Sequence, residues 1–454
     1  MSRRSKQHEA TFRPDDLVFI PLGGSGEIGM NLNLYGHQGK WLMVDCGITF
    51  DSTQGTTEVI TPDPTFIAQR RESLLGLVVT HAHEDHLGAI AYLWPHLRCP
   101  VYATPFPAEI LRRKLFEAGL QGVPLHEIPT SGHLSLPPFD MRFVDITHST
   151  AESSAIIIDT PHGVIVHTGD FKLDPDPVVG PVTDADVLRA VGDRGVLAAI
   201  SDSTNATKEG RSRSEGELRE QLFGMLGRFE RRIAVACFAS NIARIATFVE
   251  AAKRLDRHPI IAGRSLLRMI GAARRTGYLG GFETEVAPRD IGYLPASKVF
   301  MICTGTQGEP GAALSRISNN DHRDVFLERG DAVVFSSKII PGNELPIDAL
   351  HRRFRRSGIE VVSEQDEFVH VSGHPARDEL REMYAWTKPR IVIPVHGEKR
   401  HMEAHAELAT SCGVRETLVP FNGAVVRLAP GPAEIVGKVH AGRLRLDGQR
   451  LVKV

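Results

Sequence analysis

Residues 74–86 read LLGLVVTHAHEDH and place four candidate metal ligands at the end of an apolar run. The apolar part predicts a buried strand. The four residues are His81, His83, Asp85 and His86. The strand period places the first two on one side, whereas the last two come from the turn onto a helix expected to start near residues 87–89. Four desolvated polar groups at a strand end would be costly without a metal, so the stretch predicts a metal site whose ligands divide between two ions.

Three other apolar runs also end at a histidine or an aspartate, at His148, Asp170 and His396. Individually each could be a hydrogen-bonded core residue, but together they supply the ligands that two ions still lack. Imidazole and carboxylate groups without thiolates suit Zn²⁺ and also Mn²⁺. Asp45 follows a further run and is either a carboxylate that orients a ligand or a turn residue before Cys46.

The secondary structure expected along the chain changes at about residue 198. Residues 17–170 contain short β-branched runs between turn residues, which predict mostly strands. Residues 198–362 alternate strand-like and helix-like segments, which argues for a parallel sheet with helices on both faces. Then follow a helix (376–386), a strand (391–396), a helix over 397–413 and short strands. No linker separates tandem domains, so we expect a helix/strand module inserted into a β-rich one.

Gly24, Gly26 and Gly29 spell GxGxxG after a predicted strand. A dinucleotide-binding site would also need a helix that opens at the third glycine. Here residues 30–35 read MNLNLY and alternate like a strand. We therefore expect a turn between strands, whose glycines let the backbone approach another group, and no nucleotide site.

Composition limits the classes of function. A chain of 454 residues corresponds to about two or three domains. Hydrophobic residues make up 42% and charged residues 24%, typical of a globular chain and not of a disordered one. Lys and Arg total 53 against 55 Asp and Glu, giving a net charge of −2, so no basic excess points to nucleic acid. The 20 histidines are an excess that metal ligation would partly explain.

The cysteines and the N-terminus indicate a cytoplasmic location. The five cysteines form no CxxC pair and suggest neither a disulfide framework nor a thiolate metal site. Residues 1–16 lack the apolar stretch of a signal peptide and are expected to be a flexible tail. No apolar run approaches the roughly 20 residues that span a bilayer, so we expect no membrane partner.

The motifs together resemble a known family. HAHEDH (81–86) with His148, Asp170 and His396 resembles the metallo-β-lactamase fold, and the inserted module resembles that of the β-CASP nucleases. From about Phe19 to the C-terminus the chain is similar to the bacterial ribonuclease J family. The similar segments are ISDSTNA (200–206), FASN (238–241), CTGTQGEP (303–310), HVSGH (370–374) and PVHGE (394–398).

The resemblance implies an α/β fold in which a metallo-β-lactamase αββα sandwich carries an inserted β-CASP domain of parallel sheet and flanking helices. The sandwich would comprise residues 17–205 and 369–454, and the insert residues 206–368. Two divalent ions are implied, Zn²⁺ or alternatively Mn²⁺. One would be held by His81, His83, His148 and Asp170. The other would be held by Asp85, His86, Asp170 and His396.

The resemblance also implies the catalytic residues Asp85, His374 and Asp202. A hydroxide between the ions would attack the phosphodiester in line. His374 would give a proton to the leaving 3′ oxygen or bind the phosphate; the alternative is a residue that only opens a helix. Asp202 would orient a histidine ligand or His374; the alternative is a capping or turn residue.

The expected substrate contacts include the segment His370, Val371, Ser372, Gly373 and His374. Ser240 and Asn241 open a helix after a strand, where anions bind well, and in the family such groups recognise a 5′-monophosphate end. A plain helix cap is the alternative for Ser240. The basic run 352–356 could face RNA, but such a run is more often only a solvated helix face.

The function implied is a zinc-dependent ribonuclease with 5′→3′ exonuclease and endonuclease activity on single-stranded, 5′-monophosphorylated RNA. It would act in RNA maturation, including rRNA processing, and in mRNA decay. The alternatives are a β-CASP DNA nuclease, a small-molecule hydrolase on the same metal site, or a non-catalytic RNA-binding scaffold. The inserted module and HVSGH disfavour a small substrate.

Two features depart from the family pattern. Many members carry a histidine two residues after FASN, where this chain has Ala243. Members commonly continue into a further C-terminal domain, whereas this sequence ends at Val454, which bears on dimer stability and processivity. A homodimer or homotetramer is expected.

Overall fold

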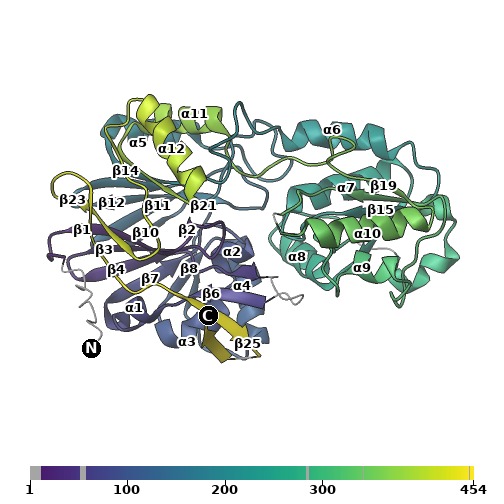
Figure 1. Cartoon of the computed structure of the whole chain (residues 1–454), viewed down its shortest axis with the longest axis horizontal. Helices are drawn as coiled ribbons and strands as arrows, with labels where there is room; N and C mark the ends of the chain where they lie inside the picture. Colours follow the sequence, from purple (N-terminus) through teal and green to yellow (C-terminus); the bar gives the residue numbers. More distant parts are fainter. Residues whose placement is uncertain (1–11, 52–57, 283–285, 341, 449) are drawn as a thin grey trace, which may run out of the picture.

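The computed structural model shows a molecule of two lobes (Figure 1). It describes residues 12–51, 58–282, 286–340, 342–448 and 450–454. Of the expected flexible tail 1–16, residues 1–11 lie outside the described part of the chain. The larger lobe contains both ends of the described chain, and the smaller lobe is formed by a central stretch of it (Figure 1).

Two β-sheets stacked face to face form the larger lobe. The first has eight strands in the order β24-β23-β1-β3-β4-β7-β8-β9. Their bounds are β24 (Glu434–Lys438), β23 (Ala424–Ala429), β1 (Leu17–Gly23), β3 (Leu32–His37), β4 (Lys40–Val44), β7 (Leu74–Val78), β8 (Val101–Ala103) and β9 (Leu125–Glu127).

The second sheet has seven strands in the order β10-β11-β12-β13-β14-β20-β22. Their bounds are β10 (His133–Leu136), β11 (Phe139–Asp145), β12 (Ser154–Thr160), β13 (Gly163–His167), β14 (Val196–Asp202), β20 (Pro389–Val395) and β22 (Glu416–Thr417). Strands β13, β14, β20 and β22 run parallel, so their carboxyl ends meet at one edge of the sheet.

Helices cover the outer faces of both sheets. The core between the sheets includes Phe19, Tyr35, Phe139 and Ile200. Helices α5 (Ala185–Arg194), α11 (Arg377–Thr387) and α12 (Lys399–Ser411) pack on the outside of the seven-stranded sheet, and helices α1 (Thr65–Ala68), α3 (Ile90–Leu97) and α4 (Pro105–Glu117) pack beside the eight-stranded one (Figure 1). The larger lobe is therefore the expected αββα sandwich.

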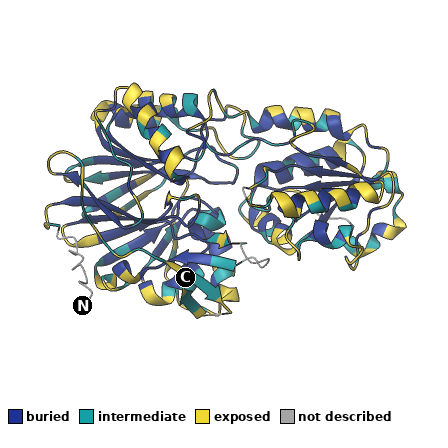
Figure 2. Ribbon diagram, viewed as in Figure 1, coloured by how far each residue is buried: buried dark blue, intermediate teal, exposed yellow. Residues whose placement is uncertain are grey.

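The smaller lobe is a five-stranded, fully parallel sheet between helices, as expected for the inserted module. Its strands, in spatial order, are β16 (His258–Ala262), β17 (Val299–Cys303), β15 (Ile233–Ala236), β18 (Ala332–Phe335) and β19 (Glu360–Val362). One face carries α6 (Glu215–Leu226), α7 (Ile242–Arg254) and α8 (Arg264–Arg275), and the other carries α9 (Ala313–Ser318) and α10 (Glu344–Arg356). Figure 2 shows the central strands of both lobes buried and the outer helix faces exposed.

Two small sheets complete the fold. Strands β2 (Ser25–Gly26) and β21 (Gly397–Glu398) pair in parallel. The hairpin of β25 (Arg443–Asp447) and β26 (Arg450–Lys453) adds to β6 (Glu58–Pro62) and β5 (Thr49–Asp51). No helix in the described ranges is long and apolar enough to cross a membrane.

The glycine-rich segment is a turn between strands, as predicted. Strands β1 and β3 flank it and pair antiparallel, and no helix opens at Gly29. Gly24, Gly26 and Gly29 all have positive φ angles, which suit glycine. The carbonyl oxygen of Gly24 accepts the His396 N–H at 2.6 Å, so the turn supports one of the predicted ligands.

One detail of the expected secondary structure differs. The region 17–170 contains α4, a helix of 13 residues that begins Pro-Phe-Pro. Proline suggests a turn in a sequence, yet it also fits the first turn of a helix, where its missing N–H is not needed. Strand β14, where the alternating pattern begins, lies in the sandwich, because it pairs with β13 and β20.

Candidate metal centre

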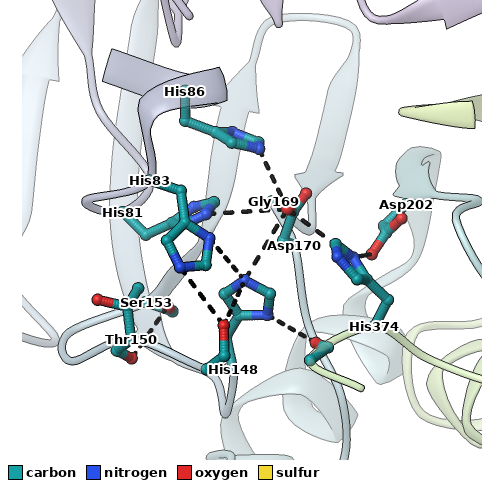
Figure 3. A network of polar contacts seen from close by, with 12 residues as sticks. His81, His83, His86, His148, Thr150, Ser153, Gly169, Asp170, Asp202 and His374 are labelled. Atoms are coloured by element: carbon teal, nitrogen blue, oxygen red, sulfur yellow. Dashed lines mark hydrogen bonds and ion pairs between the residues drawn. The ribbon is translucent and has the colours of Figure 1, made fainter. Parts of the chain in front are cut away.

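The predicted ligands converge at the ends of strands from both sheets. Figure 3 shows His81, His83, His86, His148 and Asp170 close together. His81 and His83 follow β7, Asp170 follows β13, and His396 directly follows β20. The remaining ligand-bearing segments are the loop after β11, which carries His148, and helix α2 (Glu84–Leu87), which carries Asp85 and His86. The helix thus begins earlier than expected, and these two residues lie in its first turn.

The ligand atoms form two groups that share Asp170. One group is His81, His83, His148 and Asp170, and the other is Asp85, His86, Asp170 and His396. Within each group the candidate ligand atoms lie within 4.8 Å of one another. His148 Nε2 lies 3.1 Å from His83 Nδ1. Two nitrogens about 2.0–2.1 Å from a tetrahedral zinc would be about 3.3 Å apart, so this spacing fits a shared ion.

Several polar atoms of these groups are buried without hydrogen-bond partners in the described part of the chain. They are His81 Nε2, His396 Nε2 and both carboxylate oxygens of Asp170. Buried polar groups that lack partners are costly and rare in native proteins. A cation between them would satisfy these atoms, so the residues present fit a pair of divalent ions.

Protonation also favours metal binding. Burial lowers the pKa of His83 to about 4 and holds the pKa values of His81 and His148 well below the usual range. These three imidazoles are therefore neutral near pH 7, which is the form that ligates metals. Burial acts in the same direction on His86, but the nearby Asp170, Asp45 and Asp85 carboxylates outweigh it and raise the pKa. The surplus of carboxylate at this group attracts positive charge.

Asp45 orients two of the predicted ligands. Its Oδ2 accepts the Nδ1–H of His86 at 2.7 Å, which leaves Nε2 of that ring directed at Asp170. Its Oδ1 accepts the Thr80 N–H at 2.8 Å, and the Thr80 hydroxyl lies 3.0 Å from His81 Nδ1. Such partners fix the tautomer and orientation of metal-binding imidazoles.

Asn31 is a site residue that sequence reasoning missed. Its Nδ2 donates to the Asp85 carbonyl at 3.1 Å, and its Oδ1 accepts from His396 Nδ1 at 3.1 Å. It therefore connects two ligands of the second group. It lies in the stretch NLNLY, predicted as a strand, where it carries no motif.

His374 and Asp202 form a pair at the edge of the ligand groups. Asp202 Oδ2 accepts the Nδ1–H of His374 at 2.8 Å, and the ring lies beside His148 and His396. Burial lowers the pKa of His374, but Asp202, its hydrogen bond, Asp170 and Asp85 raise it, so that the pKa rises to about 9. The imidazolium is thus available as a proton donor near neutral pH.

The segment 370–374 is fixed to the metal centre. The Gly373 carbonyl accepts the Nδ1–H of His148 at 2.6 Å, leaving Nε2 of that ring for a metal. A Cβ on Gly373 would lie 2.7 Å from His148 Cε1, so only glycine allows this approach. Asn205 Nδ2 donates to Ser372 Oγ at 2.8 Å. His370 lies partly buried and Val371 lies buried beside them.

Ser240 and Asn241 behave differently from this segment. Asn241 is the N-cap of α7, and its side chain accepts the Arg244 N–H at 2.8 Å. The Ser240 carbonyl accepts the Ile242 N–H. No hydrogen bond found in the described residues joins either side chain to the metal ligands. Ala243, which follows these residues, is buried in α7.

Comparisons with known proteins identify the class. The metallo-β-lactamase superfamily matches residues 30–207, the ribonuclease J β-CASP domain matches residues 230–352, and the Zn-dependent metallo-hydrolase RNA specificity domain matches residues 358–420. The sandwich, the insert and the ligand groups therefore define a metal-dependent hydrolase of the β-CASP type.

Similar proteins of known function identify the family within this class of hydrolases. Ribonuclease J of Sinorhizobium meliloti is 42% identical over 452 residues, covering 98% of this chain and 80% of the relative. Ribonuclease J of Mycolicibacterium smegmatis is 39% identical over 445 residues, covering 96% of this chain and 79% of the relative. The chain belongs to the ribonuclease J family of metal-dependent ribonucleases.

One solved structure shares the fold at low identity. A protein of unknown function from Enterococcus faecalis superposes with a TM-score of 0.64 at 13% identity, covering 90% of this chain and 99% of that one. This likeness supports the two-lobed architecture alone.

Both the family resemblance and the fold class expected from the sequence are confirmed by the matches to the family models and to the ribonuclease J proteins.

Proposed function

We propose that the protein is a zinc-dependent ribonuclease that hydrolyses single-stranded RNA both from the 5′ end and internally, in RNA maturation and decay. One observation carries the proposal: two four-residue ligand groups share Asp170 beside the His374–Asp202 pair. Imidazole and carboxylate ligands without a thiolate favour zinc, with manganese as the alternative.

The proposed roles divide between holding the ions and moving protons. Once bound, the two ions would activate a water molecule and stabilise charge on the reacting phosphate. The seven ligand side chains hold the ions, and Asp45 and Asn31 keep two of the imidazoles oriented. His374 holds its Nδ1–H on Asp202, so its Nε2–H is free to protonate the leaving 3′ oxygen.

Substrate binding is assigned to the segment 370–374, with Ser240 and Asn241 as the proposed contacts for a 5′-monophosphate. The cap made by Asn241 occupies its side-chain oxygen but leaves its amide group free to donate. The proposal includes action in the cytoplasm, which the five free cysteines support. A homodimer or homotetramer is also proposed, on the family resemblance alone.

Cleavage of one RNA prepared with three 5′ ends tests the proposal. The ends are 5′-hydroxyl, 5′-monophosphate and 5′-triphosphate, and the products are resolved by length over time. We expect mononucleotide release that is strongly favoured by the monophosphate, together with slower internal cuts on all three. Indifference to the 5′ end would contradict the exonuclease part, and cleavage of DNA but not RNA would overturn the whole proposal.

A further inference from the structure

The imidazole of His370 lies among four cationic side chains, Arg244, Lys338, Lys172 and Lys208. Its Nδ1 is buried and has no hydrogen-bond partner within the described ranges. Burial and the four cations hold the pKa of His370 well below its usual range, so the ring is neutral. The ring is therefore a neutral group with an unused nitrogen among cationic side chains.

Two of the four cations have carboxylate partners of their own. Arg244 Nη2 lies 3.0 Å from Glu215 Oε1, and both side chains are buried. Lys172 Nζ lies 2.7 Å from Asp174 Oδ2, also buried. Buried charges require such pairing. These two cations are neutralised inside the fold and are not available to a ligand.

Lys208 and Lys338 differ from that buried set. Both are exposed, and neither has a carboxylate oxygen within 4.0 Å among the residues that the structure describes. Their side chains lie together: partial burial of the Lys208 ammonium group and the adjacent Lys338 lower the pKa of Lys208, and Glu364 acts against them. Oε1 of that glutamate accepts the Ile339 N–H at 3.2 Å. Two like charges that face each other repel unless an anion lies between them.

The two lysines come from different lobes. Lys208 follows β14 of the sandwich, and its N–H donates to Asn205, whose side chain donates to the His374 carbonyl at 3.1 Å. Lys338 follows β18 of the insert, two residues after Ser336, which binds the Arg244 guanidinium. The Lys208 carbonyl accepts the Arg377 N–H at 3.0 Å, and Ser336 Oγ donates to the Val369 carbonyl at 2.6 Å. The two lysine-bearing segments therefore flank the segment 370–374. The lysine pair therefore spans the junction beside the proposed proton donor.

We infer that Lys208 and Lys338 jointly hold one phosphate group of bound RNA and so join the two lobes across the substrate. This inference rests on the proposed function, because it assumes an RNA substrate at the metal centre. The ligand is a phosphate, which could be the 5′-terminal monophosphate or an internal phosphodiester. Lysine ammonium groups bind phosphate oxygens as point charges, and each such contact makes binding depend more steeply on salt.

The test compares Lys208→Gln, Lys338→Gln and the double variant with wild type, each as the metal-loaded full chain. Lys253→Gln is the control, since Lys253 is exposed at the far end of α7. For each single variant we expect KM for RNA to rise about tenfold with kcat within about twofold, and the salt slope of log kcat/KM to fall by about 0.7. The double variant should lose less than the product of the singles, because the two lysines share one phosphate.

RNA with and without a 5′-monophosphate separates the two sources. A loss confined to the monophosphorylated RNA identifies the terminal phosphate, and an equal loss on both identifies an internal phosphodiester. Unchanged KM and salt slope in both single variants, with wild type cleaving RNA, would overturn the inference alone. Failure of wild type to act on RNA would overturn the proposed function first.

A second measurement shows that the variants fold and bind less phosphate. Removing one of two repelling charges should leave the melting temperature without phosphate equal to or above that of wild type. Inorganic phosphate should raise the melting temperature of wild type and of Lys253→Gln, but less so that of the double variant. An equal rise in all proteins would contradict the assigned site.

Discussion

Asp170 is the residue on which both ligand groups depend. Its Oδ2 lies 3.2 Å from His86 Nε2, 3.4 Å from His396 Nε2, 3.8 Å from His81 Nε2 and 3.9 Å from His148 Nε2. The nearby His396 and His86 outweigh burial and hold the pKa of Asp170 well below its usual range. A carboxylate in this position can serve two ions at once.

Replacing Asp170 with asparagine should therefore disrupt both sites. The amide keeps the volume but loses the charge and one ligating oxygen. We expect metal content measured by mass spectrometry to fall from two equivalents to one or fewer, and RNA hydrolysis to fall at least about a thousandfold. His133→Ala, which changes an exposed histidine paired with Asp140, is the control. Retention of two ions and full activity by Asp170→Asn would contradict the assignment.

Substitution of Asp45 tests how strongly the orientation of the His86 ring affects metal affinity. Asp45→Asn weakens the acceptor for His86 Nδ1–H without removing a metal ligand. Loss of such a partner typically lowers metal affinity about 10–100-fold. Competition with a chelator would measure the metal affinity of the variant, with Asp140→Asn, at an exposed position, as the control. An unchanged affinity would mean that Asp45 is only a turn residue.

Proton donation by His374 can be tested by changing the leaving group of the RNA substrate. His374→Ala should lower kcat about 10²–10⁴-fold while metal content stays at the wild-type level. An RNA whose scissile 3′ oxygen is replaced by sulfur has a leaving group that needs no proton, since thiol pKa values lie near 8.5. The variant should recover most of its activity on that RNA. An equal defect on both substrates would assign His374 to phosphate binding instead of proton donation.

At the scale of elements, strand ends explain why the predicted ligands lie close together in the fold. His81, Asp170 and His396 each follow an apolar strand, and the fold brings those strand ends to one edge. Such placement can be inferred from local patterns alone. Contacts such as Asn31 with His396, 365 residues apart, have no local pattern and could not be inferred.

The position of helix α2 depends on a close backbone approach. A Cβ on Gly47 would lie 1.7 Å from the Asp85 carbonyl oxygen and 2.6 Å from the His86 nitrogen. Gly47→Ala should therefore displace two ligands of the second group without changing any ligand. We expect loss of about one equivalent of metal and at least a tenfold fall in activity, because one ion alone lacks the paired clamp.

The matched control for that variant is Gly224→Ala in α6. Gly224 is exposed and helical, and a Cβ there would meet nothing within 4 Å. It should stabilise the protein by about 0.5–1 kcal/mol in urea unfolding and leave metal content unchanged. Normal metal content in Gly47→Ala would show that the loop tolerates the added atom.

At the scale of the whole molecule, two interleaved units enclose one site. The inserted module could be recognised from the alternation of strands and helices, whereas helix α4 could not, because its Pro-Phe-Pro start resembles a turn in the sequence. The net charge of −2 does not count metal ions, and the two divalent ions of the proposed function would add about four positive charges where phosphate is proposed to bind. The near-neutral chain is thus compatible with an RNA substrate.

The most direct test of the account titrates Zn²⁺, and in parallel Mn²⁺, into chelator-treated protein while RNA hydrolysis is recorded. Two ligand groups that share Asp170 predict no hydrolysis without metal and a plateau at two equivalents per chain. Full hydrolysis by metal-free protein, or a plateau reached at one equivalent, would contradict the two-ion centre.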